Sequence, residues 1–195
     1  MNGKNNMTMT DKNDDFISVD DRIDSGFLES HTHFINGLIN EETAGKAIRW
    51  IVFENMKEDN VQLTLYINSD GGNLPDAFAL IDIMRMSKKP VRTIGIGSVC
   101  SSGFLIFAAG TKGHRLVGKN TILMCHQFTE TTEGKYHDLK TKLKEGDRIN
   151  QRMVDMLADF SNLDAKAVKT KLLPPSDVWL SAEEVVELGI ADSIF

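Results

Sequence analysis

Hydrophobic positions along the chain follow two different periods, and these alternate from residue 40 onward. Apolar residues recur every three to four positions after Asn40 and again after Pro75, which predicts two amphipathic helices. Asn40 is a favoured N-cap for a helix that runs to about residue 55, and Pro75 suits a first helical turn. Short apolar runs over residues 63–67 and 91–96 predict strands that follow these helices. Such alternation is typical of α/β folds whose parallel strands are connected by crossover helices.

The same patterns predict further elements on both sides of this alternation. A loose apolar alternation over residues 27–39 predicts a short strand. Later in the chain we expect strands over 114–117, 121–125 and 190–195, and helices over about 133–160, 163–172 and 181–189. The last helix opens with the capping box formed by Ser181 and Glu184. One apolar stripe along the long helix predicts that it projects and packs against another subunit; the alternative places it across its own domain.

The stretch from Gly97 to Gly110 combines a small-residue turn, two serines and an apolar segment. This segment is too short to span a membrane, which takes about 20 apolar residues, so it predicts a buried helix. A serine at the start of such a helix is placed as a nucleophile would be, because unpaired N–H groups there stabilise a developing oxyanion. The alternative is a serine that serves only as the helix N-cap.

Composition favours one enzyme-sized domain. The chain has 195 residues, 41% of them hydrophobic, and a net charge of −6. Residues 1–15 are polar and predict a flexible tail, whereas residues 16–195 are long enough for one domain with a substantial core. No Lys/Arg run indicates nucleic acid, and no segment predicts a secretory signal or a membrane span. Cys100 and Cys125 lie in apolar surroundings and suit a reducing compartment, so we expect a cytoplasmic protein.

Two histidines raise the question of a metal. His31 and His33 would share one face of the strand predicted within residues 27–39. A His-x-His pair can bind a metal, but no third ligand is near in the sequence. Because protein metal sites need three or four ligands, we expect surface histidines here.

A serine nucleophile needs a base and an orienting acid, and two residues stand where these would be held. His126 directly follows the predicted strand over 121–125, and Asp177 lies on a loop after the pair at 174–175, Pro-Pro. The histidine would take the serine proton and return it to the leaving group, while the carboxylate fixes the imidazole tautomer. Taken alone, either residue could be structural.

Four blocks of sequence together resemble the ClpP peptidase family, the proteolytic subunit of the Clp protease. The blocks are Tyr-Ile-Asn-Ser-Asp-Gly-Gly over 66–72, Gly-Ser-Val-Cys-Ser-Ser-Gly over 97–103, Met-Cys-His-Gln over 124–127 and Asp-Val-Trp-Leu-Ser-Ala-Glu-Glu from 177. Their order and spacing match those of the family, over residues 27–195. The resemblance implies a crotonase-like α/β fold of repeated β-β-α units, in which the long helix is a projecting handle.

The resemblance also implies the chemistry, that of a serine endopeptidase. It implies that Ser101, rather than Ser102, is the nucleophile, with His126 as the general base and Asp177 as the orienting acid. The backbone N–H groups of Gly72 and Ser102 would form the oxyanion hole. The family uses no metal and no cofactor for hydrolysis.

Assembly and partners are implied in the same way. ClpP peptidases form a homo-oligomer of two stacked seven-membered rings, a tetradecamer, around a chamber in which unfolded polypeptides are cleaved. An AAA+ ATPase unfoldase feeds this chamber. The present chain has no Gly-x-x-x-x-Gly-Lys-[Ser/Thr] phosphate loop, so ATP would be consumed by the partner.

The chain departs from the family pattern at several positions near the expected site. Asp70 and Phe128 replace usual prolines, Ser102 replaces a usual methionine, and residues 129–132 replace a glycine pair. Asp70 would weaken the field of the oxyanion hole or bind a partner group. These departures are more typical of a phage-encoded or accessory copy than of a housekeeping subunit.

Three alternatives stay open beside the peptidase. An inactive, regulatory ring subunit usually loses triad residues, whereas this chain keeps all three. A crotonase-fold enzyme acting on acyl-CoA uses the same oxyanion hole but needs no Ser-His-Asp set. A Ser-Lys peptidase would not depend on His126.

Overall fold

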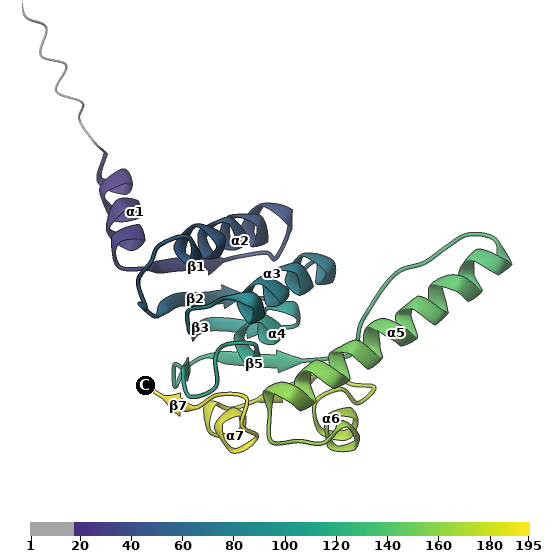
Figure 1. The fold of residues 1–195 in the computed structure, drawn as a ribbon. Helices are drawn as coiled ribbons and strands as arrows, with labels where there is room; N and C mark the ends of the chain where they lie inside the picture. Colours follow the sequence, from purple (N-terminus) through teal and green to yellow (C-terminus); the bar gives the residue numbers. More distant parts are fainter. Residues whose placement is uncertain (1–17) are drawn as a thin grey trace, which may run out of the picture.

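The computed structural model describes residues 18–195, whose strands form one sheet through the middle of the molecule (Figure 1). The strands are β1 (Thr32–Asn36), β2 (Leu63–Ser69), β3 (Val91–Cys100), β4 (Arg115–Val117), β5 (Ile122–Cys125), β6 (Val178–Leu180) and β7 (Ser193–Ile194). The helices are α1 (Val19–Glu29), α2 (Glu41–Asn55), α3 (Leu74–Met86), α4 (Ser102–Ala108), α5 (Tyr136–Phe160), α6 (Ala165–Lys171) and α7 (Ala182–Glu187). The tail predicted over residues 1–15 lies outside the described residues.

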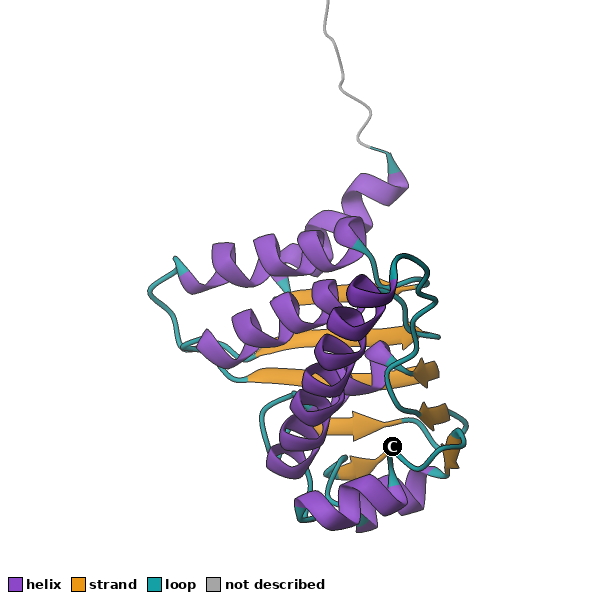
Figure 2. Cartoon of the chain, turned by 90° about the vertical axis from the view of Figure 1, so that its right-hand side faces the viewer, coloured by secondary structure: helices purple, strands orange, loops and turns teal. Residues whose placement is uncertain are grey.

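The sheet is parallel apart from one pair of strands. Strands β1, β2, β3, β4 and β7 lie side by side in that order, and every neighbouring pair is parallel. Strand β5 runs parallel to the end of β3, and β6 pairs with β5 in the antiparallel sense. Figure 2 shows the long helix α5 crossing in front of the strands. The predicted α/β class with parallel strands is confirmed, while the repeated β-β-α unit stays a prediction.

Strand β3 changes neighbours along its length, and this positions its last residue. Residues 93–95 pair with β4, whereas residues 98–100 pair with β5. Between the two sections Gly97 has a φ of +60°, and a Cβ there would overlap the Asn68 side chain. Because L residues rarely adopt this conformation, glycine is required at the bend.

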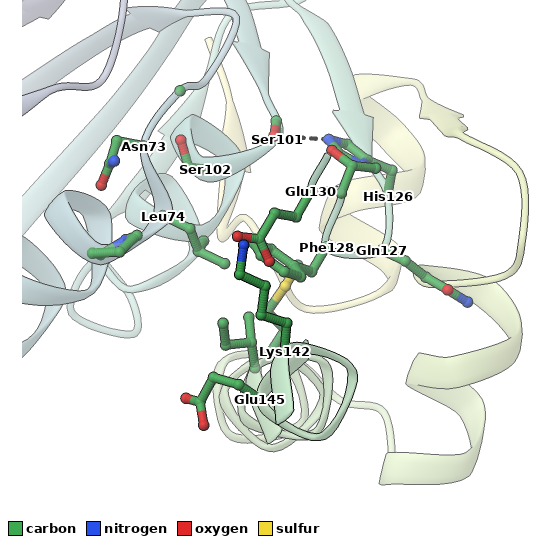
Figure 3. A pocket seen from close by; sticks show the side chains of 15 residues that line it. Asn73, Leu74, Ser101, Ser102, His126, Gln127, Phe128, Glu130, Lys142 and Glu145 are labelled. Carbon is green, nitrogen blue, oxygen red and sulfur yellow. Dashed lines mark hydrogen bonds between the residues drawn. The ribbon is translucent and has the colours of Figure 1, made fainter. Parts of the chain in front are cut away.

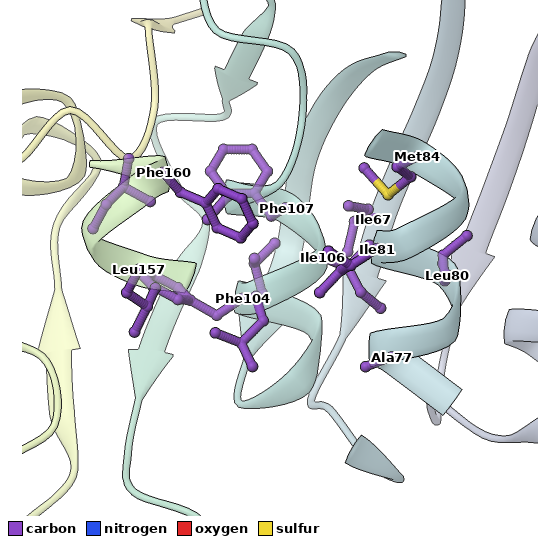
Figure 4. Packing of buried hydrophobic residues seen from close by; sticks show 14 of the residues in the cluster. Ile67, Ala77, Leu80, Ile81, Met84, Phe104, Ile106, Phe107, Leu157 and Phe160 are labelled. Atoms are coloured by element: carbon purple, nitrogen blue, oxygen red, sulfur yellow. The ribbon is translucent and has the colours of Figure 1, made fainter. Parts of the chain in front are cut away.

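Helix α4 forms the centre of the core. All seven of its residues are buried, as the apolar segment predicted. Phe104 and Phe107 lie between Ile81 of α3 and the last turns of α5, where Leu157 and Phe160 are buried (Figure 4). Burying a side chain of this size contributes about 1.5–3 kcal/mol, so α4 is fixed firmly where it meets β3.

Helix α5 is buried only over its second half. Its buried residues begin at Met153, while Tyr136 and Leu143 are each 65% exposed. Figure 1 shows its first turns extending away from the sheet. The long helix is present, and its packing against another subunit stays a prediction.

The N-terminal part of the domain differs from the sequence-based expectation. Helix α1 was not predicted; it begins with a capping box in which Ser18 and Asp21 satisfy each other's backbone N–H groups. Phe27 belongs to this helix, so only residues 32–36 of the stretch 27–39 form a strand. Near the other end of the chain, the short strand β6 was also not predicted.

The two N-terminal histidines are not simple surface residues. His31 lies before β1 with a φ of +52°, and its Nδ1 is 2.7 Å from Oε2 of the buried Glu54. His33 stacks on Trp50 with 5.3 Å between ring centroids. Burial, together with the Lys46 ammonium, lowers the pKa of His33. Within residues 18–195, no group of three His, Cys, Asp or Glu side chains is arranged to hold a metal.

A buried arginine ties the C-terminal segment to the body of the domain. The Arg115 guanidinium donates to both carboxylate oxygens of Asp192, at 3.0 and 2.7 Å, and to the carbonyl oxygens of Phe160 and Gly189. Burial of the Asp192 carboxylate opposes its ionisation, but the hydrogen bonds from Arg115 outweigh this and lower the pKa of Asp192.

No helix in the described part of the chain is long and apolar enough to cross a bilayer.

Candidate active site

Ser101 occupies a sharp turn between a strand and a buried helix. Strand β3 ends at Cys100, four residues later than predicted, and α4 begins at Ser102. Ser101 itself has φ 54° and ψ −124°, a region that costs an L residue about 1–3 kcal/mol. Although Ser101 is the N-cap residue, its side chain makes no capping hydrogen bond. The hydroxyl is therefore free for a different partner.

That partner is His126. The ladder between β3 and β5 pairs Cys100 with Met124, and the Ser101 N–H donates to the Met124 carbonyl oxygen at 2.9 Å. Two residues beyond Met124, His126 extends its ring toward the serine. Its Nε2 lies 2.8 Å from Oγ of Ser101 (Figure 3). When Nε2 carries no proton, the Ser101 hydroxyl donates to it, which is the contact that a general base requires.

The two glycines after β2 pack directly against this serine. A Cβ on Gly71, where φ is +104°, would lie 2.6 Å from Cβ of Ser101. Gly72 forms a bridge with Ile39, in which the Ile39 N–H donates to Gly71 and the Asn73 N–H donates to Ile39, both at 2.8 Å. A Cβ on Gly72 would overlap the Ile39 carbonyl oxygen. Glycine is thus required at both positions for the turn to approach Ser101.

Two backbone N–H groups beside the serine have no carbonyl partner among residues 18–195. The bridge at Ile39 does not use the N–H of Gly72, and the N–H of Ser102 belongs to the unpaired first turn of α4. Neither group donates to a backbone oxygen in any of the contacts found between elements of residues 18–195. Such groups are available to a negatively charged oxygen, as an oxyanion hole requires.

Gly72, Ser101, Ser102 and His126 line a cleft of about 430 Å³. Figure 3 shows the cleft between the end of β5, the start of α3 and one side of α5. Apolar side chains from Leu74, Phe128, Ile149 and Met153 form much of its wall, with Glu130, Lys142 and Glu145 among the charged ones. A cleft of this size and lining accepts a side chain or a short segment of a peptide.

Asp177 and His126 flank the last paired residues of β5 and β6, and no hydrogen bond joins them within residues 18–195. Strands β5 and β6 pair Cys125 with Val178, so His126 and Asp177 are the next opposing positions of this antiparallel ladder. Opposing positions have Cα atoms about 4.5–5.5 Å apart. Asp177 is exposed, and the hydrogen bonds found within residues 18–195 include none between its carboxylate and His126.

Two further side chains near Ser101, those of Asp70 and Cys125, do not take part in the cleft chemistry. The Asp70 carboxylate accepts a hydrogen bond from the Ser98 hydroxyl, and the residues that line the cleft do not include Asp70. Cys125 lies beside His126, but burial raises the pKa of its thiol to about 12. A protonated, buried thiol is a poor nucleophile, so Cys125 does not compete with Ser101.

The segment after His126 is held by residues that the sequence did not single out. The Gln127 side chain donates to the Leu173 carbonyl oxygen at 2.8 Å, and the Phe128 N–H donates to Oδ1 of Asn150 at 2.9 Å. Both contacts join residues more than twenty positions apart. No local pattern marks such pairs, because their distance depends on how α5 and α6 pack.

The comparison with known protein families gives a match that covers every described residue. Residues 18–195 match the family model described as Clp protease.

Proposed function

The chain belongs to the Clp protease family, and on that premise we propose that it is a serine endopeptidase that uses Ser101, His126 and Asp177 as its catalytic triad. The peptidase character follows from the family itself. The observation that carries the assignment of residues is the 2.8 Å separation between Oγ of Ser101 and Nε2 of His126.

The reaction follows from this pair. The Ser101 oxygen attacks the carbonyl carbon of a peptide bond while its proton moves to Nε2 of His126. The carbonyl oxygen becomes an oxyanion, which accepts hydrogen bonds from the N–H groups of Gly72 and Ser102. The C–N bond then breaks as His126 protonates the departing amine. Water next attacks the acyl carbonyl while His126 takes its proton, and the bond to the Ser101 oxygen breaks as His126 returns that proton to the serine.

Asp177 is proposed as the residue that orients the His126 ring. Its support is the β5–β6 ladder, which brings the two residues to opposing positions. We propose that the exposed carboxylate bonds to Nδ1 in the substrate-bound protein, because catalytic contacts of this kind often tighten only when substrate is bound. An orienting carboxylate contributes about 10⁴ in kcat in serine proteases.

The test is the hydrolysis of a fluorogenic peptide, with fluorophosphonate labelling as a second readout. We expect the unchanged protein to cleave and to be labelled at Ser101, and we expect Ser101→Ala to lose both activities. Ser98→Ala is the matched control, because Ser98 lies in the strand that leads to Ser101, but its hydroxyl contacts Asp70 instead of His126. An unchanged protein that is neither labelled nor active would favour the inactive ring subunit.

We further propose that the chain forms two stacked seven-membered rings and receives unfolded polypeptides from an AAA+ ATPase. The family resemblance supports this assembly, and so do the exposed apolar side chains Tyr136 and Leu143 on the extended half of α5. Native mass spectrometry reports the ring size directly. A monomer or a single ring under native conditions would contradict the proposal.

A further inference from the structure

We propose that Asn150 of α5 is a positioning residue that fixes one wall of the cleft by holding the backbone N–H of Phe128. The proposal rests on the peptidase function above and deepens it, because it concerns how a peptide is held beside Ser101.

The first step is the contact itself. Oδ1 of Asn150 accepts the Phe128 N–H at 2.9 Å, and both residues are half-buried. Asn150 follows Ile149, which lines the cleft, while Asn150 also lines a separate polar cavity of about 380 Å³ between α5 and α6. The hydrogen bond thus joins Phe128, which lines the cleft, to a residue that lines the neighbouring polar cavity.

The second step is that this wall lies beyond the end of the sheet, where the Gln127 side chain is bonded to the Leu173 carbonyl oxygen but the backbone has no ladder partner. Strand β5 ends at Cys125, and residues 126–135 form neither strand nor helix. Phe128, Thr129 and Glu130 nevertheless line the cleft, following His126 along one side of it (Figure 3). Because the sheet does not hold these residues, the Asn150 side chain supplies the support that a ladder would otherwise provide.

The third step separates the wall from the reacting groups. His126 directly follows a residue that is paired in the sheet, and its Nε2 contacts Ser101. Loss of the Asn150 contact therefore leaves this pair in place and loosens the wall beyond it. Since a net hydrogen bond corresponds to between about two- and tenfold in an equilibrium constant, the expected effect is a rise of this size in KM.

A substitution at Phe128 distinguishes loss of the hydrogen bond to Asn150 from a general loss of stability. Proline has no N–H, so a chain with Phe128→Pro offers nothing for Asn150 to accept. In that background the change Asn150→Ala should alter KM no further. The comparison is made within each background, because the lost phenyl ring changes the cleft by itself.

The experiment measures kcat and KM for a fluorogenic peptide and the rate of fluorophosphonate labelling, with the full chain. We expect Asn150→Ala to raise KM two- to tenfold, with kcat and labelling unchanged, and to speed hydrogen exchange over residues 127–130. Asn150→Asp keeps an acceptor oxygen and should restore KM. Gln151→Ala is the matched control, since Gln151 lines the polar cavity but bonds to Asp155 and Lys169.

The outcomes distinguish the two proposals. A KM for Asn150→Ala equal to that of Gln151→Ala would overturn the positioning role, and so would an equal rise in the Phe128→Pro background. If Asn150→Ala folds poorly, the positioning role is tested with Asn150→Asp instead. Its KM and the hydrogen exchange of residues 127–130 in that variant should match those of the unchanged protein, and a difference would overturn the role. Absence of labelling in the unchanged protein would instead overturn the peptidase function on which the role rests.

Discussion

Replacing Gly71 by alanine should displace the serine while leaving the rest of the fold intact. The added Cβ would lie 2.6 Å from Cβ of Ser101 and 2.9 Å from the Cys100 carbonyl oxygen. Ordinary contact begins near 3.4 Å, so the turn and the serine must separate by about 0.8 Å. Neither side yields easily, because Ser101 is already held at a φ of 54°.

The size of the effect follows from this displacement. A reacting group that is misplaced by about 1 Å costs roughly 10²-fold in rate, so we expect kcat/KM to fall by about two orders of magnitude. The positive φ of Gly71 adds a backbone cost of about 1–3 kcal/mol. In a domain of this size each kcal/mol lowers the melting temperature by about 2–4 °C.

A matched control separates the effect of the contact with Ser101 from the cost of placing alanine at a positive φ. Gly37 also has a positive φ, +87°, but a Cβ there meets nothing within 4 Å. Gly37→Ala should therefore lose stability and keep its activity, whereas Gly71→Ala should lose both. Peptide hydrolysis, fluorophosphonate labelling and thermal unfolding are measured for both variants. Equal activity in the two variants would refute the argument that Gly71 makes room for Ser101.

Three further predictions concern groups around the site and the C-terminal segment. Ser102→Ala should keep activity within a few-fold and keep or raise the melting temperature, because the buried Ser102 hydroxyl has no hydrogen-bond partner in the described part of the chain; a large loss of kcat would show that this hydroxyl takes part. Asp192→Asn should destabilise the protein at neutral pH by about 3 kcal/mol, since it leaves the Arg115 charge unpaired. The lowered pKa of Asp192 means that its contribution is present above the unfolded value near 3.9 and is lost as pH falls through the folded value, so unfolding curves of the two proteins should converge at low pH. Cys100 and Cys125 are both buried and unpaired, so iodoacetamide should label them only after unfolding, and rapid labelling of the native protein would contradict their burial.

The regular elements of the fold could be predicted where period and capping residues agree. Helix α2 begins after its predicted N-cap Asn40, and α7 begins after the capping box at Ser181. Helix α1 has the same kind of box at Ser18, and its apolar residues Val19, Ile23 and Phe27 recur every four positions, although none of its residues is buried. A search for capping boxes alone would have found it.

The candidate site shows where sequence reasoning ends. The motif order predicted Ser101 and His126 as site residues, and their side chains are in contact in the structure. The unusual backbone of Ser101 depends on β3 continuing past the bend at Gly97, which the apolar pattern does not show because residues 97–98 are a glycine and a serine. The anchoring of Phe128 by Asn150 depends on the packing of α5. Contacts of this kind are set by tertiary structure, and a single sequence has no period that reports them.

The pairing of β5 with β6 has a consequence for how such a protein can change. The segment from residue 127 to residue 176 leaves the sheet after His126 and returns just before Asp177, at opposing positions of one antiparallel ladder. Its helices can therefore lengthen, shorten or change sequence without shifting the register of the two residues that it separates. The cleft wall at Phe128 and the exposed first half of α5 lie on this excursion, so both can change while His126 and Asp177 keep their register.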